Sequence, residues 1–501
     1  MWFVCCSVTG DTSQPIEACR RYRACKQRKL RNYKKKYVAE IEKAFSENRS
    51  NLWPTINRMI NKPFSSCNAP EKYAFHNYFE QISKPIEAKY FDKSVIQECM
   101  EFLQKYDMLK CNRLNCNLEN DIINQNFTLN EITSAIDSLK NNKAPGTDCI
   151  PSEFFKQCKN QIAGDLVLLF NYFVEYKEFP DIWCEGVKSA LFKSGDFHDL
   201  NNYRGITILP VIENIFEMAF YRRMMFVNEA FNKIDINNGG FLPGSRTSDN
   251  IFILNGLIQR QLAFGRNLYV CFVDFSKAFD MISRHILFYK LIKQGWHGRV
   301  IDTVRNLYSK ITFRVERHGM LCPVISNSVG VNQGGVASGL FFRKFMADLH
   351  KYLKTECGIC MSDTIIAYLL WADDLILLSD TEHGLQKQLD GLAKFCSRNH
   401  MIVNELKTKV MVFGKHSKCD VKFNECPIAV VQKYKYLGVI IRTISRISQD
   451  AFSEHYGYLC DKARKASFSS RRKLKSISPL PVKCMFSIFE SLKKTCSIVW
   501  Q

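Results

Sequence analysis

The chain has 501 residues and a formal net charge of +21 at pH 7, and 46% of its residues are hydrophobic. This composition excludes a disordered tail, allows several domains with cores of their own, and favours a polyanionic partner, with nucleic acid the first candidate. No apolar run approaches the roughly 18 residues of a membrane-spanning helix, and Met1–Cys6 lacks the basic leader of a signal peptide. The 21 cysteines are scattered and odd in number, which is typical of a reducing compartment. We therefore predict an intracellular protein of the nucleus, the cytoplasm or both, neither secreted nor bound to a membrane.

The N-terminal segment from Arg20 to Lys36 is dominated by Lys and Arg, with Tyr interleaved. Such a block is either a solvated helix face or a surface that contacts phosphates, and its density favours phosphate contact. Helical patterns continue over Asn51–Ile60 and Lys72–Tyr106, and the Asn-rich stretch 112–126 is predicted to be a connector.

Thr128 begins a predicted helix, with Glu131 in the capping-box position. Further on, the strand-like pieces VKSALFK and YRGITIL bracket a loop, and they carry Lys193 and Arg204 respectively. Isolated cations are usually solvated on the surface. Two cations presented from both ends of one hairpin are better placed to hold a triphosphate.

Two acidic segments about a hundred residues apart carry the main chemical signal. In LYVCFVDFSKAFD an almost continuous apolar run leads to Asp274, as expected of a strand covered on both faces. In AYLLWADDLILLSD two apolar runs flank Asp373 and Asp374, which indicates a hairpin with the acids at its turn. Two carboxylates about 4 Å apart repel by roughly 4 kcal/mol at an effective dielectric near 20, and Mg²⁺ relieves that repulsion. The alternative is a turn with solvated acids.

The segments around the acids complete a recognisable order. Ser283 can cap a helix, Gly330–Phe342 is glycine-rich and then helical, and an amphipathic helix spans Leu385–Cys396. Strands are predicted at KVMVF and KYLGVII, so strand, helix, hairpin, helix and strand follow one another, as in a split βαβ sheet with its acids on adjacent strands. Cys357 and Cys360 form a lone Cys-x-x-Cys, better explained as ordinary buried thiols than as a zinc site.

Taken in order, the segments resemble the reverse transcriptase of a non-long-terminal-repeat (LINE-like) retrotransposon. The resemblance covers roughly Phe127–Ile441 and rests on NNKAPGTDCIPSEFFK, FPDIWCEGVKSALFKSGD, LNNYRGITILPVIENIFE, GGFLPGSRTSDNI, FVDFSKAFD, GVNQGGVASGLFF, WADD, VNELKTKVMVF and YKYLGVII. It implies an α+β right-hand polymerase with an antiparallel palm sheet. The expected domains are a basic helical N-terminal arm (1–70), a helical connector (71–126), fingers (127–255), a palm (256–441) and a truncated helical thumb (442–501).

The resemblance also assigns roles to single residues. Asp274 and Asp373 would hold two Mg²⁺ ions, or Mn²⁺ in their place, with Asp374 in support and the Phe275 carbonyl as a further ligand. The other implied roles are the triphosphate grip (Lys193, Arg204), the steric gate against a ribose 2′-OH (Phe279), the loop against template and incoming base (Gln333, Gly334), a proton donor to pyrophosphate (Lys407) and the primer-grip turn (Tyr436, Leu437, Gly438).

Some positions depart from the family's pattern. Trp371 replaces Tyr or Phe, Gly339 stands where proline is usual, Cys149 replaces glycine, and Asn238 and Asn214 replace Gln and Lys. The family's endonuclease has no counterpart in the sequence, and we expect a fragment of an element's reading frame.

The function implied is RNA-directed DNA polymerase, acting on template RNA, a DNA primer and deoxynucleoside triphosphates. Two alternatives are a non-catalytic nucleic-acid-binding copy of such an element and another RNA-templated polymerase, such as a splicing maturase relative. The retained acids and cations favour an enzyme over the first, and NYRGITIL with SKAFD favours the LINE type over the second.

Overall fold

The structure is a computed structural model that describes residues 72–108, 122–231, 238–317, 320–361, 364–415 and 419–474, together with Gln27, Arg28 and Asn32. It divides into two compact units, one of Asn68–Phe452 and one of Met1–Cys67 with Ser453–Gln501. The second unit contributes the helix α17 (Ser453–Leu474). The basic segment Arg20–Lys36 lies almost wholly outside the described residues. None of the described helices combines the length and apolar character needed to cross a membrane.

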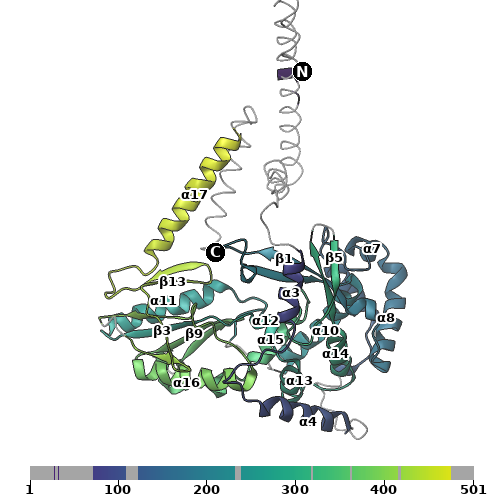
Figure 1. The fold of residues 1–501 in the computed structure, drawn as a ribbon, viewed down its shortest axis with the longest axis horizontal. Helices are drawn as coiled ribbons and strands as arrows, with labels where there is room; N and C mark the ends of the chain where they lie inside the picture. The colour runs from purple at the N-terminus through teal and green to yellow at the C-terminus, as the bar shows by residue number, and fades with distance from the viewer. Residues whose placement is uncertain are drawn as a thin grey trace, which may run out of the picture. The chain divides into compact units, whose positions relative to one another are not determined.

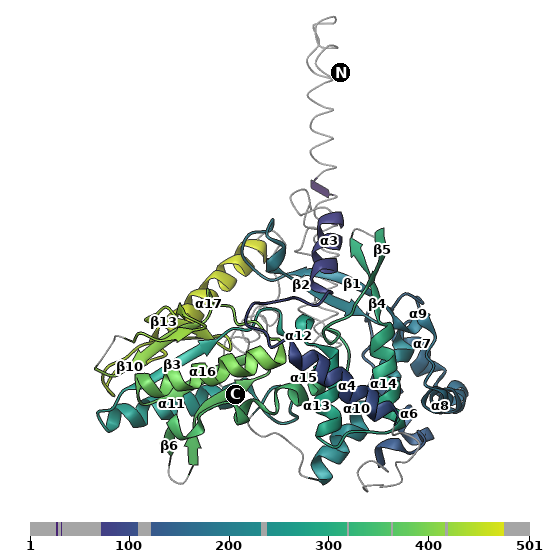
Figure 2. The ribbon, with the colours of Figure 1, turned by 60° about the horizontal axis from the view of Figure 1, so that its bottom comes forward.

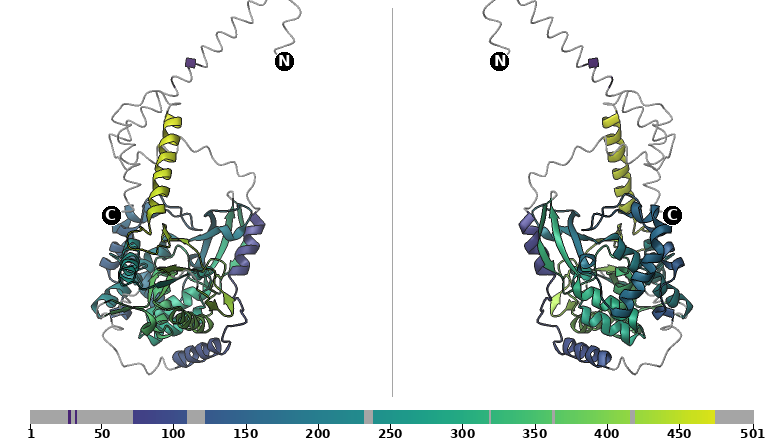
Figure 3. Two further views of the ribbon diagram at one scale, coloured as in Figure 1. Left: turned by 90° about the vertical axis from the view of Figure 1, so that its left-hand side faces the viewer. Right: turned by 90° about the vertical axis from the view of Figure 1, so that its right-hand side faces the viewer.

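The first sheet of the large unit is four-stranded, in the order β2–β1–β4–β5. Its strands are β1 (Glu185–Phe192), β2 (Tyr203–Ile208), β4 (Thr312–Arg317) and β5 (Met320–Ser326). The predicted hairpin is confirmed, because β1 and β2 pair antiparallel, and β4 joins β1 in parallel. The helix α3 (Lys72–Ile82) covers this sheet through Phe75 and Phe79, which pack with Phe313 and Ile325. The side views in Figure 3 show α3, in purple, on the sheet's outer face.

The second sheet carries the acids, and its order is β10–β3–β9–β8. The strands are β3 (Leu268–Val273), β8 (Tyr368–Trp371), β9 (Asp374–Ser379) and β10 (Lys409–Phe413). Every neighbouring pair is antiparallel. With β3 as the first strand and β10 as the fourth, the order is that of a split βαβ sheet, as the sequence predicts.

Both faces of this sheet are covered, which explains why β3 is buried along its whole length. On one face Tyr269, Cys271 and Val273 share a core with Leu385 and Leu389 of α16 (Glu382–Asn399). The alternate residues of β3 point to the other face, which α11 (Thr247–Ala263) and the hairpin β13–β14 cover (Lys433–Tyr436, Val439–Arg442). Figure 1 shows α11 and α16 on opposite sides of the strands.

The remaining helices form one large apolar core beside the two sheets. They include α4 (Ser94–Met108), α6 (Leu129–Ser138), α7 (Ser152–Gln157), α8 (Lys159–Tyr176), α9 (Asp181–Cys184), α10 (Val211–Ala230), α12 (Ala278–Met281), α13 (Arg284–Lys293), α14 (Arg299–Lys310) and α15 (Ser338–Met346). The capping box of Thr128 and Glu131 is confirmed at the start of α6. Figure 2 shows α4 along α13 and α14.

Short elements complete the unit: the pairs β6–β7 (Ile359–Met361, Thr364–Ile366) and β11–β12 (Lys422–Phe423, Cys426–Pro427), and the 3₁₀ turns η4 (Leu200–Asn202), η5 (Leu349–Lys351) and η6 (Thr355–Cys357). Cys357 is half-buried and Cys360 is exposed, so the prediction that both are buried thiols is wrong. No group of three or more metal-binding side chains occurs among the described residues.

Three local predictions differ from the structure. Ser283 precedes α13 as expected, but its side chain makes no capping hydrogen bond. The helical pattern over Lys72–Tyr106 divides into α3 and α4, because the chain turns between Ser83 and Lys93. KYLGVII is two strands, β13 and β14, joined by a turn in which Leu437 and Gly438 have φ values of 44° and 89°. The turn coincides with Tyr436–Gly438, where the resemblance expects one, but the prediction of a single strand over KYLGVII is wrong.

Two glutamates on α10 are buried against each other. Glu213 and Glu217 are 1% and 2% exposed. The Glu217 carboxylate accepts hydrogen bonds from the backbone N–H groups of Val336 (2.8 Å) and Ala337 (3.4 Å), where α15 begins. Burial raises the pKa of both carboxyl groups, and the neighbouring Glu217 raises the pKa of Glu213 further. The pair therefore holds a proton to a higher pH than an ordinary carboxyl group does, and Glu217 fastens the glycine-rich loop before α15 to the core.

We expect Glu213→Gln to flatten the pH dependence of stability. Because burial raises the pKa of both groups in the folded state, the folded protein keeps protons that the unfolded chain releases above about pH 4.3. The free energy of unfolding of the wild type must then fall as pH rises from there. The variant has one titrating group fewer, so urea denaturation between about pH 5 and about pH 8 should show a shallower fall. Glu229→Gln, an exposed position on the same helix, is the control, and parallel profiles for Glu213→Gln and wild type would contradict the shared-proton assignment.

Candidate active site

The three predicted acids meet at the junction of β3 and β9. Asp274 follows the last residue of β3, and Asp374 begins β9. Because Val273 pairs with Leu375, the antiparallel register sets these two acids opposite each other. Asp373 lies in the turn between β8 and β9, next to Ala372, whose φ is 57°. The structure therefore places the acids on adjacent strands, as the sequence predicts.

The electrostatics of the acids show that they are short of compensating charge. Burial raises the pKa of Asp274 and of Asp373 above their ordinary values. Burial, followed by the charges of Asp373 and Asp274, raises the pKa of Asp374 to about 6. Lys407 is the nearest cation to Asp274, with 4.0 Å between Nζ and Oδ2, but its side chain is 70% exposed. Solvent screens an ion pair of that kind, so the cluster attracts further cations.

Lys193 and Arg204 are brought to the same cluster from the first sheet. They flank the loop between β1 and β2, where the Lys193 N–H donates to the Asn202 carbonyl at 2.9 Å. Burial lowers the pKa of Lys193, Arg204 and Lys407 lower it further, and Asp373 and Asp274 act in the opposite direction. Arg204 and Lys193 in turn offset part of the rise in the pKa of Asp373. Cations from one sheet and acids from the other therefore face each other.

The oxygen atoms available suit a divalent ion that is shared with a substrate. Phe275 and Val403 form an antiparallel bridge, and the residues that flank them make its hydrogen bonds. The Ser276 N–H donates to the Ile402 carbonyl at 2.8 Å, and the Asn404 N–H donates to the Asp274 carbonyl at 2.7 Å. In that pattern the carbonyl of Phe275 points away from Val403. Asp274, Asp373 and this carbonyl are hard oxygen donors, and Mg²⁺ commonly takes one or two carboxylates together with substrate phosphates. The donor set therefore fits such an ion.

Phe279 follows Asp274 by five residues and lies in α12, and the Gln333 loop lies against β2. One face of the Phe279 ring stacks on Phe342 at 4.3 Å between centroids, and its edge meets Phe241 at 5.7 Å. The Gln333 carbonyl accepts the N–H of Thr207 on β2 at 2.9 Å. Gly334 has a φ of 131°, and a Cβ there would come within 2.4 Å of the Thr207 carbonyl oxygen. The loop is therefore docked on β2 with no room for a side chain at position 334.

Half-buried Asp280 and buried Lys188 form a charged layer behind Gln333 that the sequence alone did not indicate. Gln333 Nε2 donates to Asp280 Oδ2 at 2.6 Å. Lys188 is 5% exposed and its ammonium lies 3.7 Å from the Phe313 ring centroid. Burial lowers the pKa of Lys188 to about 8, and Asp280 opposes that shift. Asp280 is the last residue of the motif FVDFSKAFD, and its place in that motif is the sequence feature that could have identified it as a candidate site residue.

The predicted primer-grip turn is anchored through Tyr436. This side chain is 3% exposed, accepts a hydrogen bond from Asn250 of α11 at 3.3 Å, and lies against Phe272 of β3. Burial raises the pKa of Tyr436. Its neighbour Tyr434 stacks on Phe272 with 4.4 Å between centroids. Tyr436 therefore fixes the hairpin, while Leu437 and Gly438 occupy its tip.

Three departures from the family's pattern have a local structural counterpart. Gly339 faces Phe241, whose ring a Cβ would approach to 2.6 Å, so the extra space is filled by an aromatic ring. Cys149 adopts a φ of 57°, a region in which glycine carries no steric cost and other residues do. Asn214 is used locally, and its amide donates to the carbonyls of Leu209 and Pro210.

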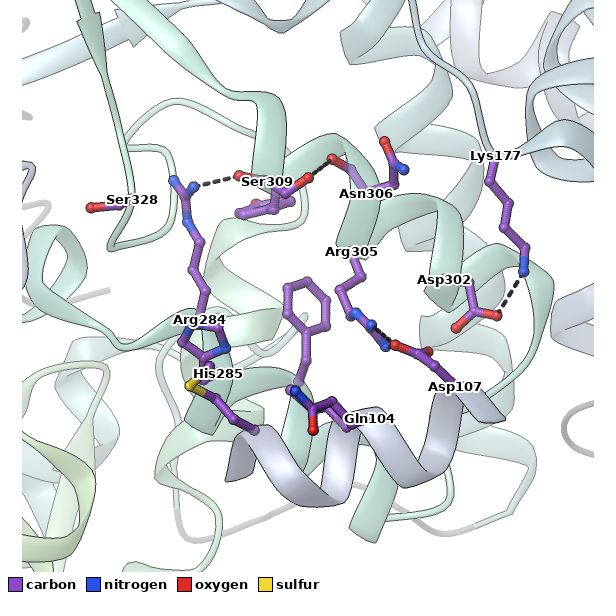
Figure 4. A pocket seen from close by; sticks show the side chains of 14 residues that line it. Gln104, Asp107, Lys177, Arg284, His285, Asp302, Arg305, Asn306, Ser309 and Ser328 are labelled. Carbon is purple, nitrogen blue, oxygen red and sulfur yellow. Dashed lines mark hydrogen bonds and ion pairs between the residues drawn. The ribbon is translucent and has the colours of Figure 1, made fainter. Parts of the chain in front are cut away.

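A cavity of about 540 Å³ lies elsewhere, between α4, α13 and α14. Its charged side chains are already paired: Lys177 points to Asp302 at 3.3 Å, and Arg305 points to Asp107 (Figure 4). The Arg284 guanidinium donates to four backbone carbonyls, among them those of Gly330 and Val329. None of the predicted site residues lines this cavity. The cavity lies at a packing interface between helices and is not the reaction site.

Comparison with known proteins identifies the family of part of the chain. Residues 192–441 match the family model described as reverse transcriptase (RNA-dependent DNA polymerase). The RNA-directed DNA polymerase from mobile element jockey of Drosophila melanogaster is 24% identical over 383 residues, which are 74% of this chain and 40% of that protein.

Two further relatives show the same partial coverage. The probable RNA-directed DNA polymerase from transposon X-element of Drosophila melanogaster is 25% identical over 66% of this chain and 36% of its own length. The Pol polyprotein from type-1 retrotransposable element R2 of Bradysia coprophila is 24% identical over 64% of this chain and 38% of its own length. The chain thus spans less than half the length of these relatives. Its residues 192–441 belong to the reverse transcriptase family, and within it to the kind that non-long-terminal-repeat retrotransposons carry.

Proposed function

We propose that the protein is an RNA-directed DNA polymerase that extends a DNA primer on an RNA template. The observation that carries the proposal is the meeting of Asp274, Asp373 and Asp374 at one end of β3 and β9, with Lys193 and Arg204 facing them from the β1–β2 hairpin. Acids that repel one another and cations that face them are the arrangement required to bind a metal-bound triphosphate. The net charge of +21 supports a nucleic-acid substrate.

In this proposal residues 127–255 are the fingers, 256–441 the palm and 442–501 part of a thumb. The primer 3′-oxygen forms a bond to the α-phosphorus of a deoxynucleoside triphosphate while the bond from that phosphorus to pyrophosphate breaks, and the electron pair leaves with pyrophosphate. Two Mg²⁺ ions, with Mn²⁺ as a substitute, would be held by Asp274, Asp373 and the Phe275 carbonyl, and would stabilise the charge on the attacking and leaving oxygens.

The chain's own side chains bind and orient the substrates. Lys193 and Arg204 hold the triphosphate oxygens, and Arg204 can do so in a bidentate manner. Lys407 Nζ, 4.0 Å from Asp274 Oδ2, is placed to give a proton to the departing pyrophosphate. Gln333 and Gly334 present a flat backbone to the template and base, and Leu437 and Gly438 present the primer-grip turn.

Asp274→Asn and Asp373→Asn should each abolish primer extension while leaving RNA binding nearly intact. Each carboxylate supplies charge to the reacting centre, and its loss should lower the rate by at least about a hundredfold. Extension on poly-rA/oligo-dT with Mg²⁺ or Mn²⁺, beside a filter-binding assay, measures both quantities. Asp380→Asn, an exposed acid beyond the other end of β9, is the control. A wild-type protein that binds the duplex but never extends it would support the binding-only alternative and overturn the proposal.

Phe279→Val should increase ribonucleotide incorporation relative to deoxynucleotide by about tenfold, which is equivalent to about 1.4 kcal/mol. The Phe279 ring is only partly buried, and it stacks on Phe342 with 4.3 Å between ring centroids. A planar ring there leaves neither space nor a hydrogen-bond partner for a 2′-hydroxyl. Single-nucleotide kinetics with dTTP and UTP give the ratio.

Phe342→Leu is the matched control for the gate, because Phe342 is fully buried and supports Phe279 from behind. If the aromatic pair serves packing alone, both variants lose the two substrates in equal proportion. That outcome would remove Phe279 from the list of nucleotide-selecting residues.

A further inference from the structure

The segment Asn238–Gly240 lies directly against the tip of the hairpin that carries Asp373. Asn238 forms a parallel bridge with Leu370 of β8, and the Gly239 N–H donates to the Leu370 carbonyl at 3.2 Å. The segment therefore runs beside the last residues of β8 and continues to the turn itself. This contact joins residues more than 130 positions apart in the sequence.

The Asn238 side chain reaches past this bridge to the turn. Its Oδ1 accepts the N–H of Ala372 at 3.0 Å and the N–H of Gly240 at 3.0 Å. Asn238 is 0% exposed, so water cannot replace either bond. Ala372 has a φ of 57° and immediately precedes Asp373. One oxygen atom thus ties the strained residue of the turn to the neighbouring segment.

The two glycines after Asn238 explain how the segment approaches so closely. A Cβ at Gly240 would come within 2.3 Å of the Ala372 nitrogen, and a Cβ at Gly239 within 2.8 Å of the Trp371 ring. Only backbone fits at both places. The backbone of Asn238–Gly240 therefore packs closely against the Trp371–Ala372 turn, and the Asn238 side chain supplies the hydrogen-bond acceptor.

We infer that Asn238 is a positioning residue for Asp373, and that it acts by fixing the Ala372 turn. A non-glycine residue in the left-handed region is disfavoured and keeps that conformation only when its surroundings impose it. A buried N–H without a partner is also unfavourable. With the Asn238 oxygen removed, the turn relaxes to another backbone conformation, and the Asp373 carboxylate moves with it.

The inference rests on the proposed function for its catalytic consequence but not for its structural one. A small displacement of a reacting group can lower the rate by about a hundredfold while substrate still binds. We therefore expect Asn238→Ala to lower kcat by about 10- to 100-fold with little change in the KM for dTTP. Asn238→Asp keeps an acceptor oxygen at the same place and separates the hydrogen bond from the volume of the side chain.

The test is hydrogen exchange of the peptide Tyr368–Leu377, measured by mass spectrometry on the full chain, beside primer-extension kinetics. The Asn238→Ala variant should exchange about one more amide rapidly than wild type, because the bond to Ala372 is lost. Asn238→Asp should retain the protection. Asn399→Ala removes a comparably buried amide that bonds to Phe395 far from the turn, and it should change neither the exchange of this peptide nor kcat.

Unchanged exchange in Asn238→Ala, or the same loss of kcat in Asn399→Ala, would overturn the inference. If Asn238→Ala fails to fold, Asn238→Asp becomes the test. Retained protection of the Tyr368–Leu377 peptide in this variant is the expected result, and loss of that protection would count against Asn238 as the residue that fixes the Ala372 turn. The exchange measurement does not depend on turnover. A wild-type protein without polymerase activity therefore speaks against the proposed function, and the exchange result alone then judges Asn238.

Discussion

Carboxylates that the sheet forces together are the constraint on which the rest of this structure depends. The register of β3 with β9 sets Asp274 opposite Asp374, and the hairpin turn adds Asp373. The backbone of the sheet holds the acids together although Asp374 itself is exposed, and partial desolvation with the charges of Asp373 and Asp274 raises the pKa of Asp374 to about 6. Such an arrangement works against folding, and perturbed groups of this kind concentrate at functional sites.

The surrounding elements bring positive charge close to these mutually repelling carboxylates. The β1–β2 hairpin brings Lys193 and Arg204 toward the acids, and Lys407 approaches Asp274 from the segment before β10. These cations are partly exposed, so they leave room for further positive charge from ions and for the negative charge of a triphosphate. Residues 192–441, which include these acids and cations, belong to the reverse transcriptase family.

A layer of buried polar groups holds the reacting parts in place. Glu217 fastens the start of α15 through two backbone N–H groups, Asp280 accepts the Gln333 amide, and Asn238 accepts the Ala372 N–H. Each joins segments distant in sequence. These groups are costly to bury without partners, and once paired they define one arrangement of loop and turn. The precision of the site therefore depends on residues that never meet the substrate.

The sequence was sufficient for features that are local. The apolar run of β3, the two runs around Asp373 and the capping box at Thr128 are short-range patterns, and the structure confirms them. The sequence failed where the information is not local. Nothing in the neighbourhood of Glu217 or Asn238 indicates a partner more than a hundred residues away.

The central claim is that the acids form a cation site, and metal binding tests it most directly. Free Mn²⁺ can be followed by electron paramagnetic resonance during titration of the purified protein without nucleotide. The account predicts saturable uptake by the wild type that disappears when Asp274→Asn and Asp373→Asn are combined, while the folded structure is retained. Equal uptake by the wild type and the double variant would contradict it.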